Sequence, residues 1–238
     1  MILARSLAFN FLFFLGGSLF LVALLPGLLL PRRWVRHFPA IWHGYVLWAL
    51  QLTCGITYEI RGRENLPAGP SLVAVKHQSA WDTMILPIVL GDAAFVLKRQ
   101  LLQIPIYGWY LRKLDNLPVD RAGGASALRA MVETGRRILS QGRSIVIFPE
   151  GTRTAPGERR PYHPGTAALY TQLHVQVVPV ALNSGFYWGR RAFLKRPGRI
   201  VLEFLPPIAP GLPRKTFMRE LESRIETASD RLCAEAGA

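Results

Sequence analysis

Cysteines and acidic side chains are scarce in this chain of 238 residues. The two cysteines, Cys54 and Cys233, lie far apart and form no CxxC or Cys/His pattern. Neither a disulfide framework nor a zinc site is therefore indicated, and we expect ordinary thiols in a reducing compartment. Asp and Glu number 15 against 29 Lys and Arg, which gives a formal net charge of +14. This excess favours an anionic partner: nucleic acid, lipid headgroups, a phosphorylated substrate or an acidic carrier protein.

Charge is missing altogether from residues 7–30, which hold one clearly polar side chain. As a helix this segment would be about 36 Å long at ~1.5 Å per residue, longer than the ~30 Å hydrocarbon core of a bilayer. Arg5 precedes it, and a larger basic cluster follows at Arg32, Arg33 and Arg36, which predicts a cytoplasmic location for the rest of the chain. No small-x-small cleavage site follows, so a cleaved signal peptide is the poorer interpretation.

A second apolar stretch, residues 38–56, is rich in Trp and Tyr. Because these side chains favour the headgroup region, we expect an interfacial or hairpin-returning helix there, with the bend near Pro26 or Pro31. We therefore predict a membrane-anchoring helical segment over residues 1–56 and a catalytic domain over residues 57–238. The sequence leaves open whether the first helix spans the bilayer or lies within one leaflet.

The second domain alternates short apolar runs with longer helical patterns. The runs predict strands at residues 56–62, 71–76, 93–98, 143–148, 175–182 and 199–205. Helical patterns occupy residues 80–90, 105–114, 123–140, 165–173 and 215–234. Strands that alternate with helices predict a single α/β domain with a central sheet flanked by helices.

A basic segment lies between the last two predicted strands. Residues 187–200 carry five basic side chains and no acidic one, namely Arg190, Arg191, Lys195, Arg196 and Arg199. They form either a solvated loop or a surface that lies against anionic headgroups or an acidic carrier protein.

A histidine and a carboxylate follow the second predicted strand, at His77 and Asp82. Five residues advance a helix by about 500°, so the two side chains cannot share one face of a regular helix. If His77 lies in the loop and Asp82 in the first turn of the next helix, the loop can fold back. Asp82 would then accept a hydrogen bond from the imidazole and leave the other ring nitrogen to take a proton from a substrate hydroxyl.

Two further loops carry groups suited to an anion. After the strand at residues 143–148, Gly151 permits close backbone approach, Thr152 offers a hydroxyl and Arg153 offers a planar fork that fits phosphate. Another loop ends at Arg121, directly before a helix whose first N–H groups favour anions.

Together these segments resemble a known family. HQSAWD at residues 77–82, DR at 120–121, FPEGTR at 148–153 and VPV at 178–180 are similar to the four ordered motif blocks of the glycerolipid acyltransferases, the bacterial 1-acylglycerol-3-phosphate acyltransferases above all. The resemblance runs from about residue 61 to residue 207. One departure is Lys76, where asparagine is common in the family.

The resemblance implies a role for each matching residue. His77 would be the general base and Asp82 its orienting partner, and residues 178–180 would line the active-site wall. The residues implied in binding the acceptor's glycerol phosphate are Arg121, Glu150, Gly151, Thr152 and Arg153.

The implied reaction is an acyl transfer in phospholipid biosynthesis at the cytoplasmic membrane. An acyl group would pass from a thioester of acyl carrier protein or coenzyme A to the free hydroxyl of lysophosphatidic acid, giving phosphatidic acid. Membrane lipids are the expected partners, and neither a metal, a resident cofactor nor nucleic acid is expected. Another lysolipid acceptor, such as a lyso-aminolipid, remains an alternative.

Two rivals from other classes fit less well. A lipid esterase needs an activated serine, but the chain has no GxSxG elbow, and Ser79 lies inside the HQSAWD segment. A non-catalytic basic membrane scaffold would explain the charge, but the basic residues form no recognisable nucleic-acid reader and FPEGTR would have no purpose.

Overall fold

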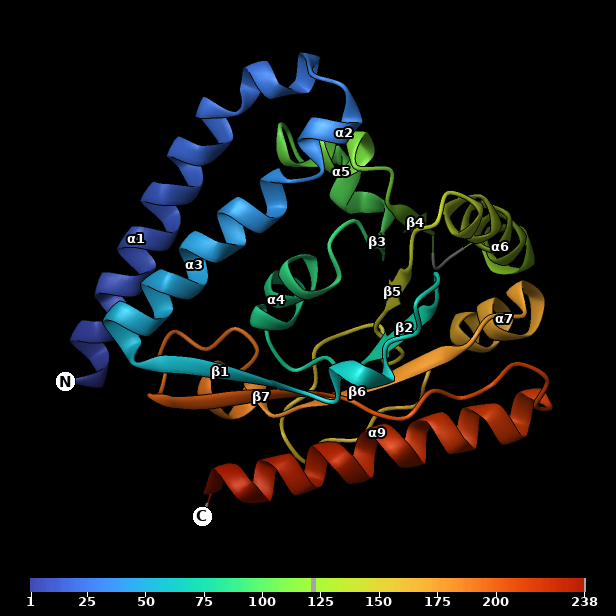
Figure 1. Ribbon diagram of the computed structural model, residues 1–238. Coiled ribbons are helices and arrows are strands. Elements are labelled where there is room, and N and C mark those ends of the chain that lie inside the picture. The colour runs from blue at the N-terminus through green and yellow to red at the C-terminus, as the bar shows by residue number, and fades with distance from the viewer. Residues whose placement is uncertain (121–122, 238) are drawn as a thin grey trace.

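The computed structural model describes residues 1–120 and 123–237 (Figure 1). These residues form a seven-stranded mixed sheet in the order β1-β7-β6-β2-β5-β3-β4. Its strands are β1 (Ile56–Arg61), β2 (Leu72–Val75), β3 (Ala94–Lys98), β4 (Leu117–Val119), β5 (Ile145–Ile147), β6 (Val177–Leu182) and β7 (Gly198–Phe204). Strands β2 to β6 run parallel, whereas β7 pairs antiparallel with β6 and parallel with β1.

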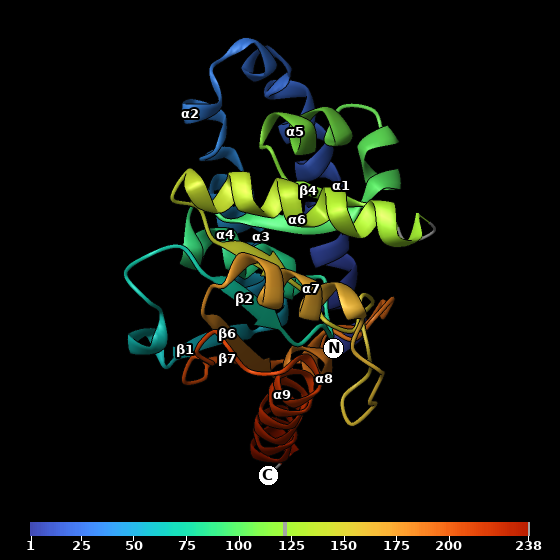
Figure 2. The same ribbon diagram turned by 90° about the vertical axis from the view of Figure 1, so that its right-hand side faces the viewer.

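The sheet is covered on both faces (Figures 1 and 2). Successive side chains of a strand point to opposite faces, so Val73 and Val75 join one core while Leu72 and Ala74 join the other. The first core is closed by α1 (Ile2–Ala23), α3 (Phe38–Cys54) and α4 (Trp81–Leu90). The second is closed by α6 (Gly124–Ser140), α7 (Pro164–Leu173) and α9 (Arg214–Gly237). The predicted α/β class is thereby confirmed.

Most predicted elements are present, and the differences have local causes. The shorter helices are η1 (Leu25–Leu29), α2 (Arg32–Val35), η2 (Arg63–Asn65), η3 (Arg99–Gln103), α5 (Tyr107–Lys113) and α8 (Ser184–Tyr187). Strand β4 was not predicted, because it is three residues long and contains Pro118. Within the described part of the chain it pairs with β3 alone, at the edge of the sheet, where a missing N–H is tolerated.

The N-terminal segment is a helical hairpin. The expectation of one continuous helix over residues 7–30 is wrong: α1 ends at Ala23, and a 3-10 turn follows that contains Pro26, which lacks an N–H and clashes with the preceding helical turn. A Cβ on Gly16 would lie 2.7 Å from ring atoms of Tyr45, so the absence of a side chain lets α3 pack closely on α1. Among the described residues, α1 is the one helix long and apolar enough to cross a membrane.

The N-terminal half of α1 is bonded to the loop between α8 and β7. Lys195 donates its backbone N–H to Ser6 Oγ at 2.9 Å and its ammonium to Asn10 Oδ1 at 2.9 Å. Phe9 packs edge-on against Trp188 with ring centroids 5.3 Å apart. Lys195 is 3% exposed, so the expectation that it belongs to an exposed basic surface is wrong. Its ammonium lies over aromatic rings instead, 5.2 Å from the ring centroid of Phe9 and 5.3 Å from that of Trp188.

The segment after α1 is bonded to α5. Leu24 O accepts a hydrogen bond from the Tyr110 hydroxyl, and Leu28 O accepts one from Lys113 Nζ at 2.8 Å. The apolar hairpin is therefore attached to residues 57–238 both within the N-terminal half of α1 and just beyond its C-terminal end.

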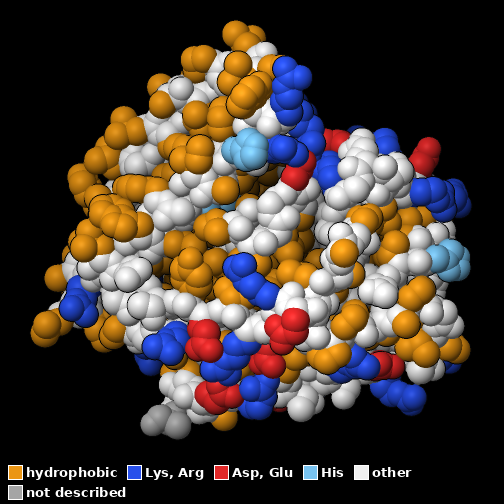
Figure 3. Space-filling model, viewed as in Figure 1, with side chains coloured by type: hydrophobic (Ala, Val, Ile, Leu, Met, Phe, Trp, Pro, Cys, Tyr) orange, Lys and Arg blue, Asp and Glu red, His pale blue; other side chains and the backbone are white. Residues whose placement is uncertain are grey.

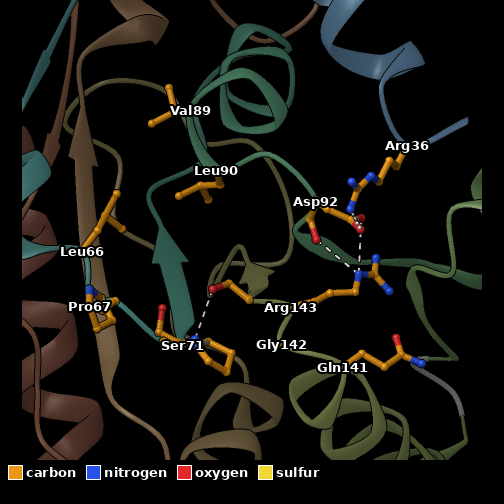
Figure 4. A pocket seen from close by; sticks show the side chains of 14 residues that line it. Arg36, Leu66, Pro67, Ser71, Val89, Leu90, Asp92, Gln141, Gly142 and Arg143 are labelled. Atoms are coloured by element: carbon orange, nitrogen blue, oxygen red, sulfur yellow. Dashed lines mark hydrogen bonds and ion pairs between the residues drawn. The ribbon is translucent and has the colours of Figure 1, made fainter. Parts of the chain in front are cut away.

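A hollow at the edge where β2, β3 and β5 begin is lined by charged groups that are already paired (Figure 4). Arg143, 6% exposed on its side chain, donates to the backbone carbonyls of Asp92 and Asp115. Arg32 and Arg36 reach the Asp92 carboxylate at 2.5 and 3.6 Å. This cluster fastens the hairpin to the sheet and lies at the edge opposite to His77, which follows the end of β2.

Candidate active site

The predicted histidine and carboxylate meet at the carboxyl end of β2. His77 is the second residue after the strand, and Asp82 is the second residue of α4. His77 Nδ1 lies 2.9 Å from Asp82 Oδ2. The loop folds back as the spacing predicts, at the edge of parallel strands where α/β sites form.

Four donors surround the Asp82 carboxylate, which is fully buried. Oδ2 accepts the backbone N–H groups of Gln78 at 2.7 Å and Ser79 at 2.8 Å, in addition to His77 Nδ1. Oδ1 accepts the Ser184 hydroxyl at 2.5 Å. Because Oδ2 already accepts two N–H groups, it acts as an acceptor toward the imidazole, so Nδ1 carries the proton. The lone pair of the neutral ring is then on Nε2.

The imidazole ring of His77 is held in one orientation and is partly exposed to solvent. It stacks on Phe148, with ring centroids 4.0 Å apart and planes inclined by 23°. Its side chain is 14% exposed, and within the described part of the chain Nε2 has no hydrogen-bond partner. The ring therefore presents a free basic nitrogen in a fixed direction.

The loop after β5 clamps the backbone of His77 on both sides. Glu150 Oε2 accepts the His77 N–H at 3.1 Å, and the Thr154 N–H donates to His77 O at 2.8 Å. Gly151 has φ of 63°, a left-handed conformation that suits glycine and lets this loop turn back toward β2.

The side chain of Lys76 contacts Glu150 on the side that faces the protein interior. Its ammonium lies 2.7 Å from Glu150 Oε1 and 2.8 Å from the Glu226 carboxylate. Burial lowers the pKa of Lys76, but the two carboxylates more than offset this effect, so its pKa lies above the usual value. Burial raises the pKa of Glu150, and the neighbouring Lys76 offsets only part of the rise.

The other predicted site residues are distributed differently. The Glu150 side chain is 0% exposed and is used inside the protein, whereas Gly151, Thr152 and Arg153 are partly exposed along the same loop. Arg121 lies outside the described residues. Substrate binding by this set stays a prediction. Residues 178 and 180, expected to line the active-site wall, are fully buried in the core beneath α4.

Ser184 was missed by the sequence analysis. It lies 102 residues from Asp82 along the chain, directly after Asn183 at the end of β6. Its only signal is that a buried parallel strand ends just before it, at the same edge of the sheet as His77.

A buried carboxylate that fixes an imidazole with one open nitrogen is suited to general-base activation of a hydroxyl nucleophile. Comparison with known proteins gives the class. The family model described as Acyltransferase matches residues 57–183, and the chain belongs to this family.

The individual proteins to which this chain is similar have a name that is more specific than that of the family. The chain is 33% identical over 218 residues to the 1-acyl-sn-glycerol-3-phosphate acyltransferase of Pseudomonas aeruginosa, covering 92% of this chain and 83% of the relative. It is 29% identical over 193 residues to the Limnanthes alba protein of the same name, covering 80% and 67%. The crystal structure of the 1-acyl-sn-glycerophosphate (LPA) acyltransferase PlsC from Thermotoga maritima has the same fold, with a TM-score of 0.76, 22% identity and coverage of 97% and 95%.

The role of Ser184 is testable by stability. Ser184→Ala leaves Asp82 Oδ1 buried without its donor, so we expect the free energy of unfolding to fall by about 1–3 kcal/mol. Denaturant titration followed by tryptophan fluorescence measures it. The matched control is Ser140→Ala, which removes an exposed hydroxyl and should change stability by less than about 0.5 kcal/mol. Equal losses in the two variants would contradict the assignment.

Proposed function

We propose that this protein is a 1-acyl-sn-glycerol-3-phosphate acyltransferase, which moves an acyl group from a thioester to lysophosphatidic acid and forms phosphatidic acid in phospholipid biosynthesis. The observation that carries the proposal is the His77–Asp82 pair with its open Nε2. The named relatives, similar over most of the chain, supply the substrate.

The geometry supports a direct transfer. Nε2 of His77 takes the proton of the acceptor hydroxyl while the oxygen attacks the thioester carbonyl carbon. Asp82 stabilises the imidazolium that forms and prevents the ring from turning. The tetrahedral intermediate then collapses, the carbon–sulfur bond breaks, and the imidazolium returns the proton to the leaving thiolate. A thioester is already activated, so no covalent enzyme intermediate is required.

Arg153 is our candidate for the acceptor's phosphate. It lies in the loop whose Glu150 and Thr154 hold His77, and its side chain is partly exposed. A guanidinium binds a phosphate through two parallel hydrogen bonds, which fixes the hydroxyl of the same small molecule relative to Nε2. The sequence supports Arg121 for the same purpose.

The outer surface of the helical hairpin formed by α1 and α3 is suited to insertion into one leaflet of the membrane. This surface exposes large apolar side chains, and Figure 3 shows them covering the part of this face that lies over α1 and α3. They include Phe11, Phe14, Leu19, Val22, Ile41, Trp48 and Leu52.

The contacts of α1 argue against a spanning orientation. Its 22 residues make a helix about 33 Å long. Lys195 of the catalytic domain is bonded to Ser6, near one end, and Tyr110 of the same domain is bonded just beyond the other. If α1 crossed the bilayer, one of these contacts would have to break. We therefore propose that α1 lies along the membrane on the cytoplasmic side, where the thioester donor, coenzyme A or acyl carrier protein, is available.

Loss of the base should abolish transfer. We expect His77→Ala to lower kcat by roughly 10²–10⁴-fold, and Asp82→Asn to be severe because a neutral amide cannot stabilise the imidazolium. Transfer of a labelled acyl group to lysophosphatidic acid measures both. The exposed imidazole of His163 provides the control, because His163→Ala should leave kcat within about twofold. A His77→Ala protein with a tenth of the wild-type rate would contradict the mechanism.

Arg153→Ala should weaken use of the phosphate-bearing acceptor. Loss of charge-assisted hydrogen bonds worth about 1.5–3 kcal/mol predicts that kcat/KM for lysophosphatidic acid falls roughly 10–150-fold. The comparison acceptor is monoacylglycerol, which lacks phosphate, and the comparison variant is Arg160→Ala, whose exposed side chain pairs with Glu158. Equal losses with the two acceptors would show that Arg153 only supports its loop.

Labelling distinguishes the two membrane orientations. In a background in which Cys54 and Cys233 are replaced by Ala, single cysteines are placed by Arg5→Cys, Arg33→Cys and Glu64→Cys, all at exposed positions. We expect an impermeant maleimide to label all three from the same side of sealed vesicles. Labelling of positions 5 and 33 from opposite sides would mean that α1 spans the bilayer.

A further inference from the structure

Helix α9 lies outside the segment that the family model matches, yet it reaches the catalytic loop. Its buried face is apolar except at Glu226, which is 3% exposed, and Ser229, so Glu226 is the one ionisable side chain among the residues that α9 buries. The large apolar members of this face are Phe217, Leu221, Ile225 and Leu232. A carboxylate on such a face has a high desolvation cost unless it is paired and hydrogen-bonded.

Glu226 is fully engaged. Both of its oxygens lie 2.8 Å from Lys76 Nζ, and Oε1 also accepts the Tyr162 hydroxyl at 2.9 Å. Lys76 is the residue directly before His77, and its ammonium also lies 2.7 Å from Glu150 Oε1. The other oxygen of Glu150 accepts the His77 N–H. A continuous series of polar contacts therefore runs from α9 through Lys76 and Glu150 to the backbone of the base.

The residues in this cluster suggest that its purpose is to fix the positions of the groups around His77 and not to stabilise the fold. Lys76 is 1% exposed and two carboxylates face it, and buried ion groups of this kind are often no more stabilising than apolar residues of similar volume. Without Glu226, the Lys76 ammonium would have one carboxylate partner and freedom to change position. Glu150 would then still be paired with Lys76, but with a cation whose position is less fixed, and its second oxygen would be held less firmly toward His77.

The same helix also supports the other member of the pair. Leu232 O accepts a hydrogen bond from Asn183 Nδ2 at 3.1 Å, and Asn183 Oδ1 accepts the Val201 N–H at 2.9 Å. The next residue, Ser184, donates to Asp82. Helix α9 therefore braces the loop of His77 at Glu226 and the loop that orients Asp82 at Leu232.

We propose that Glu226 is a positioning residue for His77, acting through Lys76 and Glu150, and that α9 belongs to the catalytic apparatus. The assignment rests on the proposed function, because the rate that it sets is the rate of acyl transfer.

Glu226→Gln is the first test. The amide keeps the shape and the contact with Tyr162, and Lys76 and Glu150 remain as a balanced ion pair. We expect kcat for acylation of lysophosphatidic acid to fall about 10–100-fold, as small displacements of a catalytic group do, while KM for each substrate stays within about twofold. The matched control is Asp230→Asn on the same helix, which breaks an exposed ion pair with Arg159 and should leave kcat unchanged. A folded Glu226→Gln enzyme with wild-type kcat would overturn the proposal.

A second variant and a second measurement keep the proposal testable if Glu226→Gln fails to fold. Tyr162→Phe removes one hydrogen bond to Glu226 without changing any charge, and we expect a loss in kcat of about two- to tenfold at unchanged KM. In parallel, the ring nitrogen signals of His77 are followed by NMR in ¹⁵N-histidine-labelled protein, assigned with His77→Ala. Glu226→Gln should shift these signals, and Asp230→Asn should not. Unchanged signals would refute positioning.

The two readouts separate this proposal from the proposed function. If the wild-type protein does not acylate lysophosphatidic acid but Glu226→Gln shifts the His77 signals, the function fails and the positioning role stands. If the wild-type protein is active and neither kcat nor the signals change in Glu226→Gln, the positioning role fails alone.

Discussion

The backbone of His77 is fixed by three hydrogen bonds with one loop, and the proposed chemistry of the site depends on them. Glu150 accepts its N–H, and the N–H and hydroxyl of Thr154 both donate to its carbonyl, so the peptide units on both sides of the base are held by the loop after β5. The side chain alone could not achieve this, because the single bond from Nδ1 to Asp82 leaves the ring free to move with its backbone. Two parallel strands that end side by side bring the two loops within reach.

The hydrogen bond from the His77 N–H to Glu150 places a charged side chain in the protein interior, and this charge has to be offset by groups that lie further inside. The Glu150 carboxylate is buried, and Lys76, the residue before His77, supplies a cation that offsets part of its desolvation cost. One ammonium in this position attracts a second carboxylate, Glu226, which brings the last helix into the site. A neutral residue at position 76, such as asparagine, would not create this requirement. The lysine and the glutamate of α9 are therefore expected to depend on each other.

Much of this architecture was predictable from local pattern. Runs such as residues 72–75 and 177–182 are apolar throughout, as strands buried on both faces must be, and His77 and Asp82 are close enough in sequence for the loop to be inferred. Prediction failed where distant segments decide the outcome. Lys195 reads as a surface cation, but it is enclosed by α1, and Ser184 has no local feature that points to Asp82. Such contacts depend on which strands become neighbours, which sequence spacing does not encode.

The apolar hairpin and the His77–Asp82 pair share one core, and this limits how the proposed enzyme mechanism can work. Leu47 and Leu50 of α3 lie in the same buried cluster as Trp81 and Ile85 of α4, the helix whose second residue is Asp82. Close-packed interiors transmit displacement rather than absorb it, so α4 cannot shift without α3. In the proposed orientation, a hairpin that lies on the lipid surface would hold the Asp82 carboxylate at a fixed height above that surface. A lysolipid acceptor is confined to the same surface by its acyl chain, so under this proposal His77 would meet the hydroxyl by lateral diffusion, and only the thioester would have to arrive from solution.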